Sequence, residues 1–230
     1  MADHKLTAAK AALSLIGPNQ SIGLGAGSTI MHLVNLIANE CKYAASLNFA
    51  SSSFKTTQLL SARSLRVSPP ALLHKLDLYF DGCDQFDAEL NALKSGGGIH
   101  TTEKVLASMA DEFVLLGDES KFAKHLNAAY PLVIEILPQA LQIVLTKAAG
   151  MFPLATITQR MSTQKDGALI SDNGNMLVDV YFTEMPNARE LNVQVKMIPG
   201  VVEHSLFYHL ATKAIIAGEG GVQSILPHRL

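Results

Sequence analysis

The sequence predicts an α/β fold, in which a parallel sheet is wrapped by helices and carries a smaller inserted α+β unit. The sheet is predicted from the first half of the chain, where short apolar runs alternate with helical patterns at a spacing typical of strand, helix, strand. A change of pattern after about residue 126 predicts the second unit. The chain has 230 residues, 48% hydrophobic and 17% charged, which excludes disorder and coiled coil and suffices for one sizeable core or two modest ones.

The first half begins with a surface helix, indicated by apolar residues at helical spacing: Leu6, Ala9, Leu13 and Ile16. A strand at 21–25 precedes a helix on which Ile30, Leu33, Val34 and Ile37 share one face. Further strands are predicted at 47–50, 76–80 and 112–117, the last after a helix at 102–110. Because parallel sheets bind ligands beyond the carboxyl ends of their strands, four loops are expected to matter: 25–29, 51–57, 81–87 and 118–121.

The second half predicts a strand at 131–137 and a helix that Pro138 opens and Gly150 ends. Strands at 152–158 and 176–182 are expected around a turn at 171–175. After Pro199-Gly200, short strand-like pieces such as 214–217 are expected to rejoin the first sheet. The predicted domains are therefore 1–125 plus 200–230, and 126–199.

Charge and cysteine content exclude several classes of protein. The formal charge is -2 with no basic block, so nucleic acid is not an expected partner. No apolar run reaches the roughly 18 residues of a membrane-spanning helix. Two cysteines, Cys41 and Cys83, favour a reducing compartment such as the cytoplasm. The histidines lack metal-ligand spacing, and there is no G-x-S-x-G nucleophile motif, so neither a metal nor nucleophilic hydrolysis is expected.

A glycine-rich segment, Gly23-Leu-Gly-Ala-Gly-Ser-Thr29, lies where a strand gives way to a helix. Backbone N–H groups at such a helix N-terminus bind anions. A dinucleotide-binding site would have Gly at position 28 and an acidic residue near positions 51–53, but this chain has serine at these positions. The lysine of a Walker A nucleotide-binding loop is also missing. The segment therefore predicts a site for a small phosphate on Gly27, Ser28 and Thr29, unless its glycines serve only tight packing.

A second group of polar residues follows the strand at 76–80. Asp81 and Asp84 belong at the sheet's carboxyl edge, and their spacing does not fit an EF-hand. Lys94 precedes Ser95 and three glycines, and Glu103 lies in the first turn of the next helix. Carboxylates, a lysine and a glycine-rich loop together indicate an acid/base site. Taken alone, Asp81–Asp87 is more simply explained as a turn, and Glu103 as an acidic residue that complements the dipole of its helix.

Taken together, these segments resemble ribose-5-phosphate isomerase of the A type over nearly the whole chain. The motifs that carry the resemblance also include Ser51-Ser-Ser53, Asp118-Glu-Ser-Lys121, Ser171-Asp-Asn-Gly-Asn175 and Ile198-Pro-Gly-Val-Val202. The resemblance implies a Rossmann-like domain, a homo-oligomer such as a homodimer, and interconversion of D-ribose 5-phosphate and D-ribulose 5-phosphate in the pentose phosphate pathway without metal or cofactor.

The resemblance also implies roles for single residues. Glu103 looks like the base that moves a proton between C1 and C2, with Lys94 stabilising the oxyanion and Asp81 and Asp84 holding sugar hydroxyls and assisting proton transfer. The substrate-binding residues that it implies are Ala26, Gly27, Ser28, Thr29, Gly82, Cys83, Ser95, Gly96, Gly97 and Lys121. A base near the operating pH and an electrophile for the enediolate oxygen are what aldose–ketose exchange requires.

Three positions depart from the family's pattern: Ala26 replaces a usual Thr, Gln85 a usual Glu, and Ser95 a usual Gly. They motivate an alternative, a non-catalytic sugar-phosphate sensor. The four acid/base residues argue against it, since binding alone does not require a proton-transfer set. A related sugar-phosphate deaminase or CoA-transferase would share the architecture more than these motifs.

Overall fold

The largest sheet of the molecule has six strands in the order β13-β12-β6-β3-β1-β2. The computed structural model describes residues 3–228. The six strands are β1 (Ser21–Leu24), β2 (Asn48–Ser51), β3 (Leu76–Asp81), β6 (Ala110–Asp118), β12 (Lys213–Gly218) and β13 (Gly221–Ile225). All neighbours pair in parallel except β12 and β13. The predicted parallel sheet is confirmed, and β12 rejoins it as expected.

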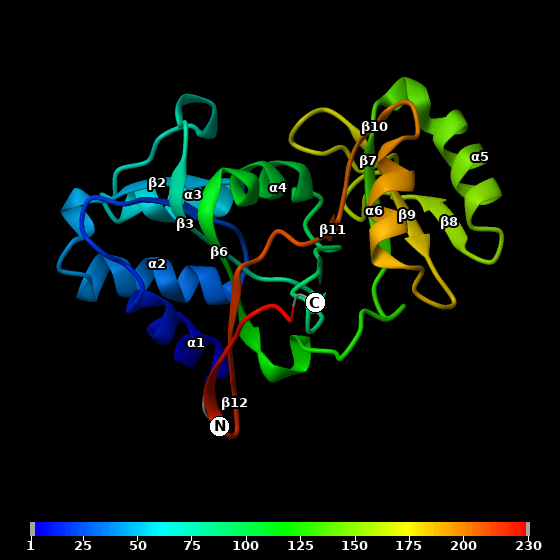
Figure 1. Ribbon diagram of the computed structural model, residues 1–230. Coiled ribbons are helices and arrows are strands. Elements are labelled where there is room, and N and C mark those ends of the chain that lie inside the picture. Colours follow the sequence, from blue (N-terminus) through cyan, green and yellow to red (C-terminus); the bar gives the residue numbers. More distant parts are fainter. Residues whose placement is uncertain (1–2, 229–230) are drawn as a thin grey trace.

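Helices cover both faces of this sheet: α1 (His4–Leu13), α2 (Ser28–Glu40), α3 (Phe54–Ala62) and α4 (His100–Met109). Because side chains alternate along a strand, Phe80 and Val114 pack against α1 and α2, whereas Tyr79 and Phe113 pack against α4. The apolar face predicted for the helix after β1 is fully buried in this way. One helix, α4, therefore lies alone over the sheet face next to the second half of the molecule (Figure 1).

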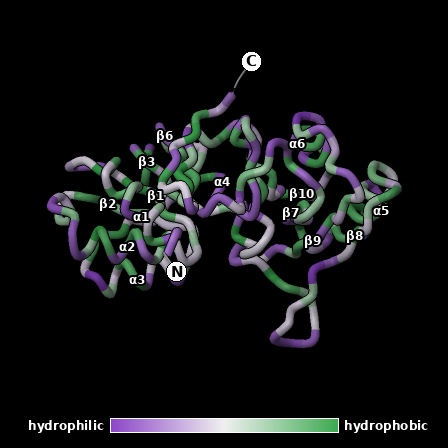
Figure 2. Tube along the Cα trace, turned by 90° about the horizontal axis from the view of Figure 1, so that it is seen from below, coloured by the Kyte–Doolittle hydropathy of each residue, from purple (hydrophilic) through white to green (hydrophobic). Residues whose placement is uncertain are grey.

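A four-stranded antiparallel sheet, in the order β10-β7-β9-β8, forms the second part of the molecule. Its elements are β7 (Leu132–Ile136), α5 (Leu141–Met151), β8 (Thr156–Gln159), β9 (Met176–Tyr181), α6 (Ala188–Lys196) and β10 (Val201–His204). Figure 2 shows that β7 and β9 are largely hydrophobic while the turns around them are hydrophilic. The smaller α+β unit expected from the change of sequence pattern is present.

Between the two parts lies a three-stranded sheet in the order β11-β5-β4. Its strands are β4 (Gln85–Phe86), β5 (Ala92–Leu93) and β11 (Leu206–Phe207). The remaining elements are the 3₁₀ turns η1 (Ala44–Ser46), η2 (Pro70–Leu72), η3 (Glu119–Lys121) and η4 (Pro138–Ala140). This small sheet matters for the site because Asp84 precedes β4 and Lys94 follows β5.

Several sequence-based details were wrong. Pro138 opens η4, and α5 begins at Leu141 and runs through Gly150 to Met151, since one glycine costs a helix only about 1 kcal/mol. Of the strand predicted at 152–158, only the end forms a strand, as part of β8 (Thr156–Gln159). After residue 200 the chain first pairs β10 with β7 and β11 with β5, and β12 then rejoins the large sheet as expected.

The predicted division into domains of 1–125 plus 200–230 and 126–199 stays a prediction. Residues 1–2 and 229–230 of the larger domain lie outside the described residues. Within residues 3–228, no helix is long and apolar enough to cross a membrane.

Candidate active site

The glycine-rich loop after β1 lies directly against the end of β3. A Cβ atom added to Gly25 would meet the Asp81 carboxyl carbon at 1.9 Å, so only glycine permits this approach. Gly27 is the N-cap of α2 with φ 96°, a conformation that also favours glycine, and no side chain caps that helix. The first N–H groups of α2 are thus left for a ligand.

Asp81 is fixed by four hydrogen-bond donors. Its Oδ1 accepts from the N–H groups of Gly82 (2.8 Å) and Ala26 (3.2 Å), and its Oδ2 accepts from the Tyr79 hydroxyl at 2.6 Å. The Lys94 ammonium lies 2.7 Å from the same Oδ2. With four donors on its two oxygens, Asp81 is held in one orientation.

Glu103 also contacts the Lys94 ammonium, but it has fewer hydrogen-bond partners than Asp81. Its Oε1 lies 3.4 Å from Lys94 Nζ, and the side chains of both residues are only 7% exposed. Burial, followed by the neighbouring charge of Asp81, raises the pKa of Glu103 to about 8 even though Lys94 opposes the shift. The sequence left open whether the helix N-terminus or burial would dominate at this residue, and the geometry makes burial dominate.

Lys94 behaves in the opposite way. Burial works to lower its pKa, but the charges of Asp81 and Glu103 raise it above the ordinary value, so the side chain stays cationic. Its ammonium also donates to the Gly82 carbonyl and lies 5.7 Å from the centre of the Phe207 ring. We call Asp81, Lys94 and Glu103 the Lys94 cluster.

The Lys94 cluster opens into a cavity of about 350 Å³, a volume ordinary for a small-molecule site. The other predicted site residues that line it are Ala26, Gly27, Ser28, Thr29, Gly82, Cys83, Asp84, Gly96, Gly97 and Lys121. Its remaining lining comes from Lys5, Ile99, Leu116, Gly117 and Asp118. Ser95 is not in the lining, and neither is any residue of the expected loop 51–57. Thr56 in that loop instead donates to the Gly25 carbonyl at 2.8 Å.

Two of the three departures from the family's pattern, Gln85 and Ser95, have local explanations. Gln85 pairs with Asn127, donating to its side-chain oxygen (2.9 Å) and accepting from its N–H (2.8 Å), which a glutamate could not do. Ser95 donates through its hydroxyl to the Pro131 carbonyl and through its N–H to Asp84 Oδ2, both at 2.6 Å. Of the three, only Ala26 faces the cavity.

Two further classes of chemistry find no support at this site. Burial raises the pKa of Cys83 to about 12, so its thiol stays protonated and is a poor nucleophile. Among the described residues, no three His, Cys, Asp or Glu side chains are arranged to hold a metal ion.

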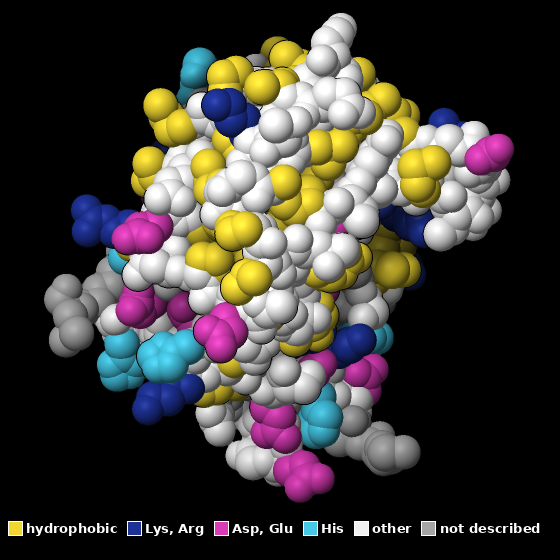
Figure 3. All heavy atoms as spheres, turned by 90° about the vertical axis from the view of Figure 1, so that its right-hand side faces the viewer, with side chains coloured by type: hydrophobic (Ala, Val, Ile, Leu, Met, Phe, Trp, Pro, Cys, Tyr) yellow, Lys and Arg dark blue, Asp and Glu magenta, His cyan; other side chains and the backbone are white. Residues whose placement is uncertain are grey.

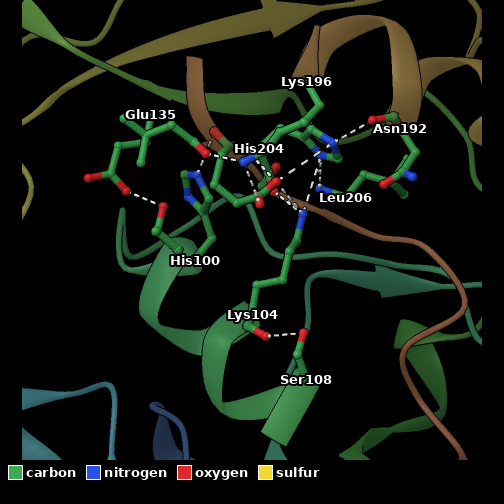
Figure 4. Close-up of polar contacts among 12 residues, drawn as sticks. His100, Lys104, Ser108, Glu135, Asn192, Lys196, His204 and Leu206 are labelled. Atoms are coloured by element: carbon green, nitrogen blue, oxygen red, sulfur yellow. Dashed lines mark hydrogen bonds and ion pairs between the residues drawn. The ribbon is translucent and has the colours of Figure 1, made fainter. Parts of the chain in front are cut away.

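A second charged cluster joins α4 to α6 and β10 (Figure 4). Lys104 follows Glu103 in the chain, and its ammonium lies 2.9 Å from Glu203 Oε1 and donates to the His204 carbonyl at 2.7 Å. Glu203 also accepts from Lys196 (2.9 Å) and from the His204 N–H (3.0 Å). We call Lys104, Lys196, Glu203 and His204 the Lys104 cluster, and it anchors α4 to β10 and α6.

The turn at 171–175 holds the first turn of α4. Its polar side chains donate to the buried Glu135 carboxylate on β7, Ser171 at 2.6 Å and Asn175 at 2.9 Å. Thr101 of α4 donates to the same carboxylate. Sequence reasoning quoted this turn only as a motif and missed its partners, because the contacts join segments far apart in the chain.

Known proteins resemble this chain over most of its length. A family model described as Ribose 5-phosphate isomerase A (phosphoriboisomerase A) matches residues 48–221. A protein of Agrobacterium fabrum called Ribose-5-phosphate isomerase A is 36% identical over 223 residues, which are 95% of this chain and 95% of that protein.

Solved structures agree in fold. Ribose 5-phosphate isomerase A from Methanocaldococcus jannaschii superposes with a TM-score of 0.90 at 32% identity, covering 97% of this chain and 98% of that one. A D-ribose-5-phosphate isomerase in complex with phospho-erythronic acid also gives 0.90, at 29% identity and the same coverage.

Proposed function

Because this chain belongs to the ribose 5-phosphate isomerase A family, we propose that it interconverts D-ribose 5-phosphate and D-ribulose 5-phosphate at the cavity beside β3. One observation carries the proposal: a buried Lys94 lies between a fixed carboxylate, Asp81, and a less restrained one, Glu103, whose pKa burial raises to about 8. A strong base beside a permanent cation is the pair that an enediolate mechanism needs.

In the aldose-to-ketose direction, Glu103 removes the proton from C2 of the open-chain sugar. The C–H electrons form the C1=C2 bond, and the carbonyl electrons move onto O1, where Lys94 stabilises the negative charge. Glu103 then returns the proton to C1, while the O2 proton passes to O1 and C2 becomes the carbonyl carbon. Atoms and electrons balance without an oxidant or a reductant.

Asp81 has a different task in this scheme. Four donors occupy its oxygens, which suits it to hold Lys94 in place and, through its charge, to raise the pKa of Glu103. Asp84, half-exposed in the cavity, is the carboxylate available to a sugar hydroxyl. The uncapped start of α2, with Ser28 and Thr29, is the end of the cavity suited to the phosphate.

Incubation of the purified chain with ribose 5-phosphate in the presence of EDTA tests the proposal. We expect ribulose 5-phosphate to accumulate to equilibrium, measured by NMR. Unreacted but bound sugar phosphate would contradict the proposal and favour the sensor, while release of ammonia from an amino sugar phosphate would favour the deaminase.

The matched control is Glu103→Gln purified in the same way, because a contaminating host isomerase would persist in that preparation. Free ribose serves as the second control. It should bind far more weakly than ribose 5-phosphate if the start of α2 receives the phosphate. Equal affinities in calorimetry would contradict that assignment.

We further propose that the chain acts as a homodimer in the cytoplasm. Both described cysteines are unpaired, which suits a reducing compartment. Hydrophobic side chains gather on the side of the molecule that carries α5 and α6 (Figure 3), including Val193 and Met197, the latter 76% exposed. Light scattering of the wild type should give twice the mass of one chain. The double variant Val193→Asp, Met197→Asp should give the mass of a single chain, because two carboxylates then replace the apolar contact. A monomeric wild type would contradict the dimer.

A further inference from the structure

Arg160, which follows β8 in the smaller unit, reaches across to the glycine loop of the site. Its guanidinium donates to the carbonyl oxygens of Ser95 (2.9 Å) and Gly96 (3.1 Å), directly after Lys94 in the chain. The side chain of Arg160 is 15% exposed, yet it is not part of the cavity lining. The contact therefore joins the two parts of the molecule through a residue that does not face the substrate.

Asp179 on β9 fixes the guanidinium in place. Arg160 Nε donates to both carboxylate oxygens, at 3.0 and 2.9 Å, and the terminal nitrogen that binds Ser95 also donates to Asp179 Oδ1 at 2.6 Å. The backbone of Arg160 is held as well, because its N–H donates to the Leu177 carbonyl at 2.8 Å. Only a planar fork of donors can serve the carboxylate and two carbonyls at once, so lysine is not equivalent here.

The two carbonyls decide where the neighbouring N–H groups point. In a planar trans peptide the N–H is directed opposite to the C=O of the same unit. With the Ser95 and Gly96 carbonyls turned toward Arg160, the N–H groups of Gly96 and Gly97 are turned away from it. Both glycines line the cavity, and within residues 3–228 neither N–H has a protein acceptor. Without the clamp, the glycines would rotate freely.

We propose that Arg160, anchored by Asp179, is a positioning residue for the isomerisation. It holds the glycine loop so that the Gly96 and Gly97 N–H groups face the oxyanion that forms beside Lys94. The inference rests on the proposed function, and it adds a part played by the smaller unit in the chemistry of the larger one. Because these donors serve the charge that develops during reaction, the clamp acts on kcat more than on KM.

Arg160→Met tests the clamp, with Arg160→Lys as the conservative variant and Arg63→Met, an exposed arginine at the end of α3, as the matched control. We expect kcat to fall about 10–100-fold in Arg160→Met while KM changes less than about threefold, since one oxyanion donor contributes about 10²–10³ in kcat. Arg160→Lys should restore part of the loss, and Arg63→Met should behave as wild type.

Binding supplies a second readout. Phospho-erythronic acid carries a planar carboxylate where the substrate forms its enediolate, so its affinity should fall in Arg160→Met by about the same factor as kcat. A variant that melts earlier but keeps near-normal kcat and affinity would make Arg160 a structural residue only, and would overturn the proposal.

The amide signals of Gly96 and Gly97 separate failure of the clamp from failure of the proposed function. In protein labelled with ¹⁵N-glycine, the clamp predicts one sharp signal for each in the wild type and broadened or doubled signals in Arg160→Met. Unchanged signals would contradict the clamp whether or not the chain turns over ribose 5-phosphate. A wild type that shows the expected signals but no turnover would contradict the proposed function alone.

Discussion

Glu103, which is buried, and Glu203, whose side chain is 17% exposed, are each paired with a lysine that lies near the Phe207 ring. Burial and Asp81 raise the pKa of Glu103 to about 8. Burial would also raise the pKa of Glu203, but Lys104 and its hydrogen bonds lower it to about 2. The same side chain in two similar clusters is thus a base in one and a permanent anion in the other.

The depth of burial and the number of donors together explain the difference in pKa, since the side chain of Glu103 is 7% exposed and that of Glu203 is 17% exposed. Glu203 accepts from Lys104, Lys196 and the His204 N–H, so its charge is compensated within the protein. Glu103 has only a share of Lys94, whose nearer partner is Asp81. A buried carboxyl whose ionised form is poorly compensated has a raised pKa and can exchange a proton near neutral pH, whereas a carboxylate that is fully compensated stays ionised and stabilises the fold.

The largest effect is expected for Glu103→Gln, which keeps the shape of the side chain but removes its basic oxygen. We expect kcat to fall by about 10²–10⁴-fold, the usual contribution of a positioned base, with little change in substrate binding. Solvent deuterium should no longer enter the product at carbon.

We expect Glu103→Gln to be at least as stable as the wild type, although its activity falls. Because the pKa of Glu103 is about 8 in the folded chain and 4.5 ordinarily, the folded state retains a proton that the unfolded state releases, and stability falls as pH rises between these values. Glutamine does not titrate, so Glu103→Gln should melt no earlier than wild type at pH 8. A lower melting temperature combined with near-normal turnover would reduce Glu103 to a helix-start acid.

Glu203→Gln should show the reverse pattern, a loss of stability with turnover retained. Its folded pKa of about 2 lies below the ordinary 4.5, so its contribution is present above pH 4.5 and is lost as pH falls toward 2. We expect the variant to lose about 1–3 kcal/mol at neutral pH, because Lys104 and Lys196 lose their common partner. Denaturant unfolding measures this loss. A hundredfold fall in kcat with unchanged stability would remove the distinction between the clusters.

The smallest effect is expected for Tyr79→Phe, which removes one of the four donors to Asp81. Because Tyr79 acts on the reaction only through Asp81, we expect only part of the about 1.5–3 kcal/mol of a hydrogen bond to a charged group to reach the transition state, so that kcat falls by less than about 10-fold. A more negative Asp81 should also raise the pKa of Glu103, so the rise of kcat/KM with pH should shift to higher pH. A shift to lower pH would contradict the role given to Asp81.

Sequence reasoning could predict the site because its parts lie at the ends of parallel strands, which meet at one edge of a sheet. Gly27 and Asp81 are each marked by a local pattern, a strand followed by small or acidic residues, and Glu103 by its place at the start of a helix after the Lys94 glycine loop. The α/β class followed for the same reason, since strand and helix periodicities are local properties of the chain.

The rest depends on contacts between distant segments. Arg160 meets Ser95 across 65 residues and Lys104 meets Glu203 across 99, and no spacing in the sequence marks either pair. Lys5 enters the cavity from α1, a helix whose pattern shows only an ordinary surface helix. The helix α6 was missed although its sequence carries the signal, since Asn187 caps it and the buried Leu191 and Val195 lie four residues apart.

The most direct test of the account is the titration of the Glu103 carboxyl itself. In protein labelled with ¹³C at the glutamate side-chain carboxyl, the signal absent from Glu103→Gln identifies this residue. We predict a midpoint near pH 8 in the wild type, well above the ordinary 4.5. A midpoint between 4 and 5 would show that burial and Asp81 do not make Glu103 a base, and would contradict the account.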